Sequence, residues 1–227
     1  ALEGARESIF MFELTLHDLV EKFDRDKINI GPDFIIKRDY EKWRELFVFY
    51  KFYKILSRYN LDYINENWKI EALEDDEEPP DLRLLKLDNQ LIKNIEIATI
   101  QAPGRRIQEE YRQDKVFESD YRTKPLPPNY LDELKRVINK KVKNQKHENY
   151  WLVIQININR VLNNLYSGQK RPVLGYWTKH VSRYLRDNLK KDTIAFNKFA
   201  FERIFIMDSN AGHLIEISSK QEIKIIH

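Results

Sequence analysis

Cysteine is absent from the 227 residues of this chain. Its absence excludes a disulfide framework, a thiolate zinc site and a cysteine nucleophile, and it is typical of proteins from a reducing compartment. Long apolar runs are also missing, because no stretch approaches the roughly 18 uncharged residues of a membrane-spanning helix. The segment 1–7 is charged where a signal peptide would be apolar. We therefore expect a cytoplasmic protein that has no membrane partner.

Glycine is scarce, with six residues, and the sequence contains neither a glycine-rich phosphate loop nor a Gly-x-Ser-x-Gly elbow. The five histidines are scattered and lack the paired spacing of a zinc site. Neither sign of charge dominates, since 39 Lys and Arg oppose 36 Asp and Glu for a net charge of +3. The distribution of charge, and not its sum, must therefore carry any electrostatic prediction.

The remaining composition is that of a globular protein, with 42% hydrophobic and 12% aromatic residues. Helical spacing of apolar residues predicts helices over residues 8–25, 39–58, 105–117 and 130–143, and a further helix that begins at Pro172. Short β-branched and aromatic segments predict strands over 68–73, 81–87, 94–100, 150–158, 203–208, 213–217 and 222–226. This order predicts an α/β fold with a central mixed β-sheet flanked by helices. We expect a single domain over 1–227, in which 1–38 form an N-terminal helical extension.

Three acidic residues stand apart from the others. Asp81 opens a predicted strand directly after Pro79-Pro80, Glu96 lies inside the next apolar strand, and Glu45 lies on a helix that should be buried. A carboxylate in an apolar strand is unfavourable unless it is paired, hydrogen-bonded or bound to a metal. Because a short turn makes these two strands natural neighbours, Asp81 and Glu96 could form an oxygen site for Mg²⁺ or Mn²⁺.

The pattern Pro80-Asp81, then Glu96-Ile97-Ala98, with Glu45 upstream, resembles the PD-(D/E)XK nuclease superfamily. The resemblance implies a restriction-endonuclease-like core and a metal-dependent nuclease that acts on DNA in preference to RNA. It also implies catalytic roles for Glu45, Asp81 and Glu96, with the metal held by Asp81 and Glu96. Because many enzymes of this type are dimers, a homodimer or a larger complex is among the expected assemblies.

Ala98 departs from the family pattern, because it occupies the position of the motif lysine. Three alternatives stay open: the role of the lysine has moved to another residue, the domain binds without cutting, or a lysine was replaced by alanine. Gln101 is our first candidate for a relocated role, because the following Pro103-Gly104 could end the strand and turn Gln101 inward.

Cationic residues supply candidate phosphate contacts in two segments, namely Arg105, Arg106 and Arg112 after the second strand, and Lys140, Lys141 and Lys143 on a predicted helix. A purely structural interpretation of these charged residues is also possible. Glu96 could pair with Arg83 or Lys93, Asp81 could cap a turn, and the basic helix face could simply be solvated. The alternative to a nuclease is thus a catalytically silent nucleic-acid- or protein-binding module of the same fold.

Overall fold

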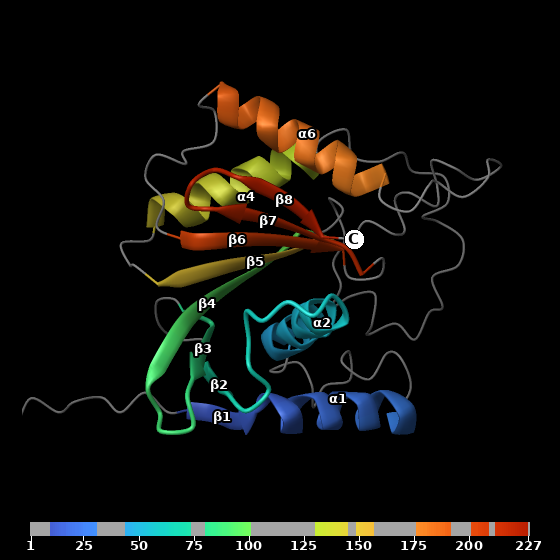
Figure 1. Cartoon of the computed structure of the whole chain (residues 1–227), viewed down its shortest axis with the longest axis vertical. Coiled ribbons are helices and arrows are strands. Elements are labelled where there is room, and N and C mark those ends of the chain that lie inside the picture. The colour runs from blue at the N-terminus through green and yellow to red at the C-terminus, as the bar shows by residue number, and fades with distance from the viewer. Residues whose placement is uncertain are drawn as a thin grey trace, which may run out of the picture. The chain divides into compact units, whose positions relative to one another are not determined.

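The computed structural model describes residues 10–30, 44–73, 80–100, 130–144, 149–156, 176–191, 201–208 and 212–226 (Figure 1). Its strands are β1 (Phe10–Thr15), β2 (Lys69–Leu73), β3 (Leu82–Leu85), β4 (Leu91–Ile100), β5 (Tyr150–Ile156), β6 (Phe201–Asp208), β7 (Leu214–Ser218) and β8 (Ile223–Ile226). Its helices are α1 (Leu16–Ile30), α2 (Arg44–Arg58), α4 (Tyr130–Asn144) and α6 (Tyr176–Lys190).

The described elements form an α/β fold, as predicted, with an eight-stranded sheet whose strands follow in chain order. The chain divides into two compact units, the first made of Ala1–Ile97 with Asn149–Trp151 and the second of Ala98–Glu148 with Leu152–His227. The single domain over 1–227 stays a prediction, because two such units can belong to one domain. Within the described ranges, no helix is long and apolar enough to cross a membrane.

The first unit is built on an antiparallel meander of β1, β2, β3 and β4. On one side of this meander, Ile70 pairs with Leu84 and Leu82 pairs with Ile95, and all four side chains are almost fully buried. Helices α1 and α2 pack against each other, and the rings of Phe23 and Tyr50 meet with their centroids 5.2 Å apart. Burial of these apolar surfaces is the main stabilising contribution to this unit.

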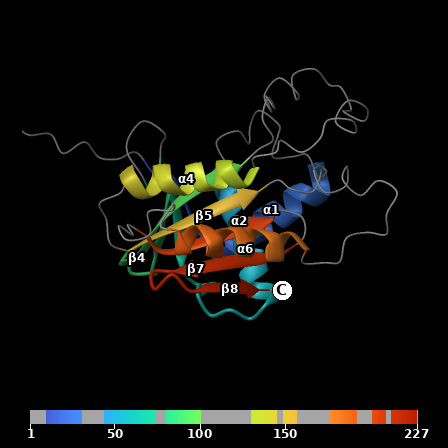
Figure 2. The same cartoon turned by 90° about the horizontal axis from the view of Figure 1, so that it is seen from above.

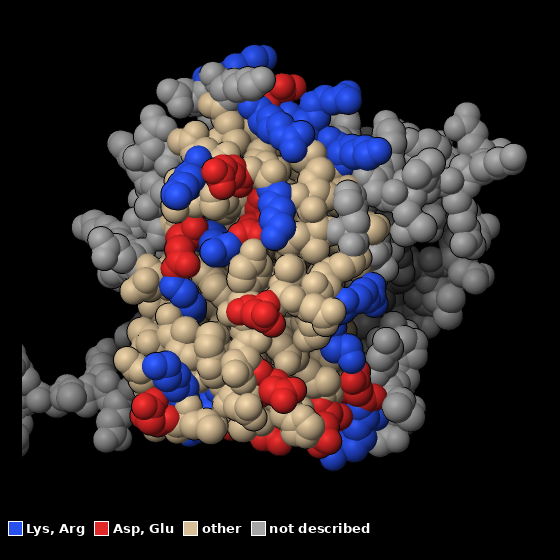
Figure 3. Space-filling model, in the orientation of Figure 1, with Lys and Arg blue, Asp and Glu red and all other residues tan. Residues whose placement is uncertain are grey.

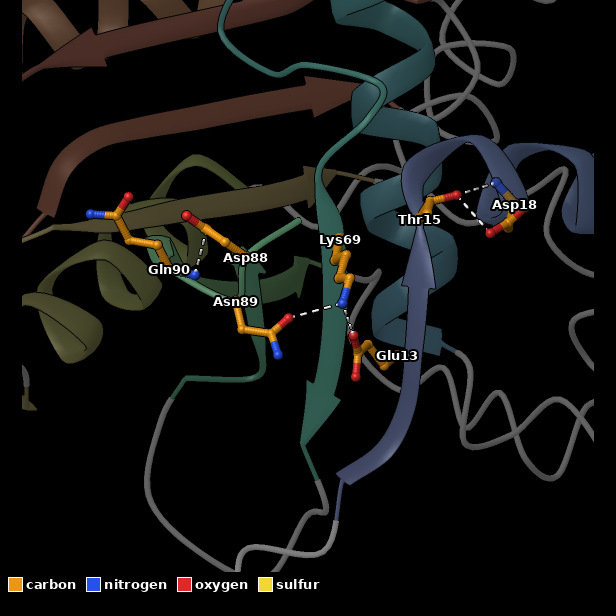
Figure 4. A network of polar contacts seen from close by, with 7 residues as sticks. All are labelled: Glu13, Thr15, Asp18, Lys69, Asp88, Asn89 and Gln90. Carbon is orange, nitrogen blue, oxygen red and sulfur yellow. Dashed lines mark hydrogen bonds and ion pairs between the residues drawn. The ribbon is translucent and has the colours of Figure 1, made fainter. Parts of the chain in front are cut away.

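The predicted helix over 8–25 is wrong for its first part, because residues 10–15 form β1 and α1 begins only at Leu16. Thr15 ends the strand and caps the helix: its Oγ1 accepts a hydrogen bond from the Asp18 backbone N–H at 3.1 Å and donates one to Asp18 Oδ2 at 2.7 Å (Figure 4). This reciprocal arrangement satisfies a backbone donor that the first turn of a helix leaves unpaired. The described part of the predicted extension over 1–38, residues 10–30, thus contains a strand as well as a helix.

A cation bridges elements of the same meander. Lys69 Nζ on β2 lies 2.5 Å from Glu13 Oε1 on β1 and 2.9 Å from Asn89 Oδ1 in the turn between β3 and β4 (Figure 4). Asn89 has a positive φ of 64°, a backbone conformation that Asn tolerates better than most residues. The short turn predicted between these two strands is confirmed, since the Asn89 N–H donates to the Lys86 carbonyl. The strand predicted over 81–87 is shorter than expected, because β3 spans only Leu82–Leu85.

The second unit contains the antiparallel meander of β6, β7 and β8. Helix α6 packs on β7 and β8 (Figures 1 and 2), with Val181 and Leu185 fully buried. Helix α4 is linked to α6 by the Tyr184 hydroxyl, which donates to Asp132 Oδ1 at 3.0 Å. The pKa of Tyr184 rises to about 12, because burial and this hydrogen bond both disfavour the tyrosinate.

Most other predicted elements are confirmed within a few residues. The helices predicted over 39–58 and 130–143 correspond to α2 and α4, and the helix predicted from Pro172 corresponds to α6. The strands predicted over 68–73, 94–100, 150–158, 203–208, 213–217 and 222–226 correspond to β2, β4, β5, β6, β7 and β8. The helix predicted over 105–117 lies outside the described residues.

Candidate functional site

Asp81 immediately precedes β3 and lies beside Glu96 of the paired strand β4 in the first unit. Leu82 pairs with Ile95 in the antiparallel ladder of β3 and β4, so Asp81 stands opposite Glu96 one step further along. The Ile97 backbone N–H donates a hydrogen bond of 2.6 Å to Asp81 Oδ2. This contact fixes the Asp81 carboxylate against β4 at the point where β3 begins.

Glu96 is a buried acid, with only 3% of its surface exposed. Besides burial, the negative charge of its carboxylate affects the pKa of Tyr150. Tyr150 is the first residue of β5 and is also buried. Burial is the largest cause of the raised pKa of Tyr150, the negative charge of Glu96 adds to it, and the positive charge of Arg83 opposes it. Glu96 and Arg83 therefore both lie within electrostatic reach of the Tyr150 hydroxyl.

A row of charged residues crosses the meander beside this pair. Glu13 pairs with Glu71, and Glu71 pairs with Arg83, on β1, β2 and β3. Burial raises the pKa of the Glu71 carboxyl, Arg83 lowers it in part, and Glu13 raises it further. Because alternate residues of an extended chain lie on one face, Arg83 of β3 lies on the same face as Asp81, which immediately precedes the strand. The face that bears the two acids is thus charged, whereas Leu82 and Leu84 face the apolar side.

The other predicted site residues fall in three groups. Glu45 lies in the first turn of α2 and is half-buried. Ala98 follows two positions after Glu96 on β4 and is also half-buried. Lys140 is exposed on α4 and Lys141 is half-buried there, while Lys143 lies near the end of the same helix. Residues outside the described ranges are Gln101, Arg105, Arg106 and Arg112.

The described ranges contain no group of three or more His, Cys, Asp or Glu side chains that could hold a metal ion. The structure therefore brings Asp81 and Glu96 to adjacent positions without gathering Glu45 into a three-acid cluster with them. Two carboxylates still match the chemistry of Mg²⁺, which prefers oxygen ligands and keeps several of its waters. No family model, curated protein or solved structure matches this chain.

Arg83 and Tyr150 are the neighbours of Glu96 that we did not include among the predicted site residues. Arg83 was predicted only as a possible partner of Glu96. Its place beside the acids follows from alternation, because it lies two residues after Asp81 in a predicted strand. Tyr150 gave no comparable signal. It opens a strand 54 positions after Glu96 in the sequence, and periodicity within a strand says nothing about which strand lies next to it.

Proposed function

We propose that this chain is a metal-dependent nuclease-like domain that acts on phosphodiester bonds, with DNA ahead of RNA as the substrate. The observation that carries the proposal is the adjacency of Glu96 on β4 and Asp81 just before the paired strand β3, where the Asp81 carboxylate accepts a hydrogen bond from Ile97 N–H. A nuclease of the PD-(D/E)XK type needs its two acids in this relation. We also propose that the core of the fold is restriction-endonuclease-like.

The donor set fits the implied metal. Asp81 and Glu96 would hold Mg²⁺ or Mn²⁺ through carboxylate oxygens, and a divalent cation would compensate the charge of Glu96, which is 3% exposed. When bound, such a metal supplies Lewis-acid polarisation of a phosphate oxygen and a bound water of lowered pKa. Glu45 would support the metal or its water from α2. Burial raises the pKa values of Glu71 and Tyr150, and Arg83 on the neighbouring strand β3 partly lowers them.

The alternative function is a catalytically silent nucleic-acid- or protein-binding module of the same fold. Ala98 favours this alternative, because it shares its side of β4 with Glu96 and has no group that transfers a proton. Losing a positioned proton-transfer group typically lowers a rate by about 10²–10⁴-fold. The two functions therefore differ mainly in whether a metal binds and whether cleavage follows.

Calorimetric titration with Mn²⁺ tests the proposal on four proteins: the parent chain, Asp81→Asn, Ala98→Lys and, as a matched control, Glu66→Gln. Glu66 is an exposed acid of the α2–β2 connection. We expect micromolar binding that Asp81→Asn abolishes and Glu66→Gln leaves unchanged. Cleavage of a labelled duplex gained by Ala98→Lys would identify position 98 as the missing catalytic position. Absence of Mn²⁺ binding in all four proteins would refute the active-nuclease proposal and favour the silent module.

A further inference from the structure

Helix α6 carries a row of cations along one side. Lys179, Arg183 and Arg186 are all exposed, and we call these three residues the cationic stripe. At 3.6 residues per turn they fall within a sector of about 60° of the helix. Lys190 occupies the next position of the same row, four residues after Arg186. Figure 3 shows Lys and Arg side chains gathered at the top of the view, where Figure 1 draws α6.

The stripe lies on a helix whose other side is buried in the second unit. Thr178, Val181, Ser182 and Leu185 are buried on another side of the helix, which packs on β7 and β8. The Asn188 side-chain amide donates to the Tyr184 carbonyl at 2.9 Å. Because the apolar side of α6 is already covered, the helix can present its charges without repacking.

The cations of the stripe differ from Arg136 of α4 in their ion pairing. Among the described residues, no acidic side chain forms an ion pair with Lys179, Arg183 or Arg186. On α4, by contrast, Arg136 Nε lies 2.7 Å from Glu133 Oε2. This hydrogen bond is the largest cause of the lowered pKa of Glu133. An anionic partner therefore gains more from α6 than from this part of α4.

The spacing of the stripe suits a phosphate backbone. Lys179 and Arg186 are seven positions apart, which corresponds to about 10.5 Å along a helix that rises 1.5 Å per residue. Each strand of a DNA duplex carries about three phosphates over that length of duplex axis. Arginine also donates in a fork that matches phosphate geometry. A lipid surface fits less well, since a helix that lies on a membrane inserts an apolar face, and that face of α6 is buried.

We infer that the cationic stripe of α6 binds the sugar-phosphate backbone of a nucleic-acid duplex, an inference that rests on the proposed function for its choice of a nucleic-acid partner. Contacts of this kind position a duplex without reading its bases. The binding should therefore depend on salt and be indifferent to sequence. It should also require no divalent metal, because the charges that make the contact are those of the protein.

Fluorescence anisotropy with a labelled duplex, in EDTA and at several salt concentrations, tests this inference on the full chain. Arg183→Gln/Arg186→Gln removes two cations of the stripe. Lys220→Gln/Lys224→Gln removes two exposed cations of the β7–β8 hairpin and is the matched control. Lys140→Gln/Lys141→Gln tests the α4 residues predicted from the sequence.

Affinity falls with salt, and each lost phosphate contact makes the slope of log affinity against log salt shallower by about 0.9. The Arg183→Gln/Arg186→Gln slope should thus be shallower by about 1.8 than the parent slope, so that the parent loses about 12-fold more affinity between about 50 and 200 mM salt. The β7–β8 control should keep the parent slope.

Equal slopes in the Arg183→Gln/Arg186→Gln variant and the parent would overturn the inference, as would an equal reduction in the β7–β8 control. Binding of the parent to phosphatidylserine vesicles but not to the duplex would overturn it as well. These outcomes are distinguishable from failure of the proposed function, because the assay contains no metal. If the Arg183→Gln/Arg186→Gln variant had a shallower slope than the parent and no protein bound Mn²⁺, the stripe would be supported as a duplex-binding site and the active-nuclease proposal would be refuted.

Discussion

Replacing Asp81 by alanine or by asparagine separates a structural role of this carboxylate from a metal-binding role. Asp81 Oδ2 accepts the Ile97 N–H at 2.6 Å in a partly buried setting. Alanine leaves that donor without its acceptor, which costs about 1–3 kcal/mol of unfolding free energy. Asparagine keeps an acceptor oxygen, and the removed charge also relieves repulsion with Glu96. The net loss for asparagine should therefore be about 1 kcal/mol or less.

Thermal unfolding followed by circular dichroism in EDTA measures this difference. In a chain of this size, each kcal/mol shifts Tm by about 2–4 °C. Asp81→Ala should thus lower Tm by about 2–12 °C, and Asp81→Asn by clearly less. Asp62 is an exposed acid of the α2–β2 connection, and its alanine variant should change stability by at most about 0.5 kcal/mol. Equal Tm values for Asp81→Ala and Asp81→Asn would refute the reasoning, because the hydrogen bond to β4 would then contribute nothing.

Addition of Mn²⁺ extends the same experiment. A metal that binds only the folded chain raises its stability by about 2.7 kcal/mol at a concentration 100 times Kd. The parent should gain this stabilisation, whereas both Asp81 variants should lose it despite their different Tm values in EDTA. A Tm gain retained in Asp81→Asn would mean that the metal binds elsewhere.

Two further predictions concern the first unit. Because burial raises the pKa of Glu71, the folded chain holds that proton more tightly than the unfolded chain, and stability falls as pH rises through the ordinary and then the raised pKa. Glu71→Gln should therefore raise Tm, relative to the parent, more at about pH 7 than at about pH 4, and a pH-independent difference would contradict this. Thr15→Ala removes the cap of α1 and should cost about 1 kcal/mol, measured by urea unfolding, whereas Thr99→Ala, at an exposed position of β4, should cost little.

The fold class followed from periodicity, but the boundary at Thr15 did not. Residues 10–15 contain apolar side chains that fit both a helical and an alternating pattern, and periodicity alone does not separate these for short runs. Residues 10–15 form a strand because they pair with β2, with Leu14 opposite Ile70. The Thr15 and Asp18 spacing was a usable signal, because an N-cap followed three residues later by an acid predicts a helix start.

The sequence predicted the two acids of the candidate site, but it did not predict the residues and hydrogen bonds that surround them. Asp81 and Glu96 lie in consecutive predicted strands, so their adjacency follows from the short turn that joins these strands. The hydrogen bond from Ile97 to Asp81 depends on how β3 begins, which no spacing encodes. The cationic stripe was not predicted, because apolar periodicity identifies the buried side of a helix and does not show whether exposed cations such as Arg183 and Arg186 have acidic partners.

Strand β1 stands at one end of the strand order and, in the part of the chain that the structure describes, pairs only with β2. Such an edge offers unpaired backbone groups on which strands of other molecules could assemble into aggregates. The register of β1 shifts between Phe10 and Phe12, an irregularity that breaks the even spacing of donors and acceptors and increases the local twist. The same irregularity therefore disfavours pairing of the apolar start of β1 with an edge strand of another molecule. A deletion that restored a regular ladder would make this chain more prone to aggregate.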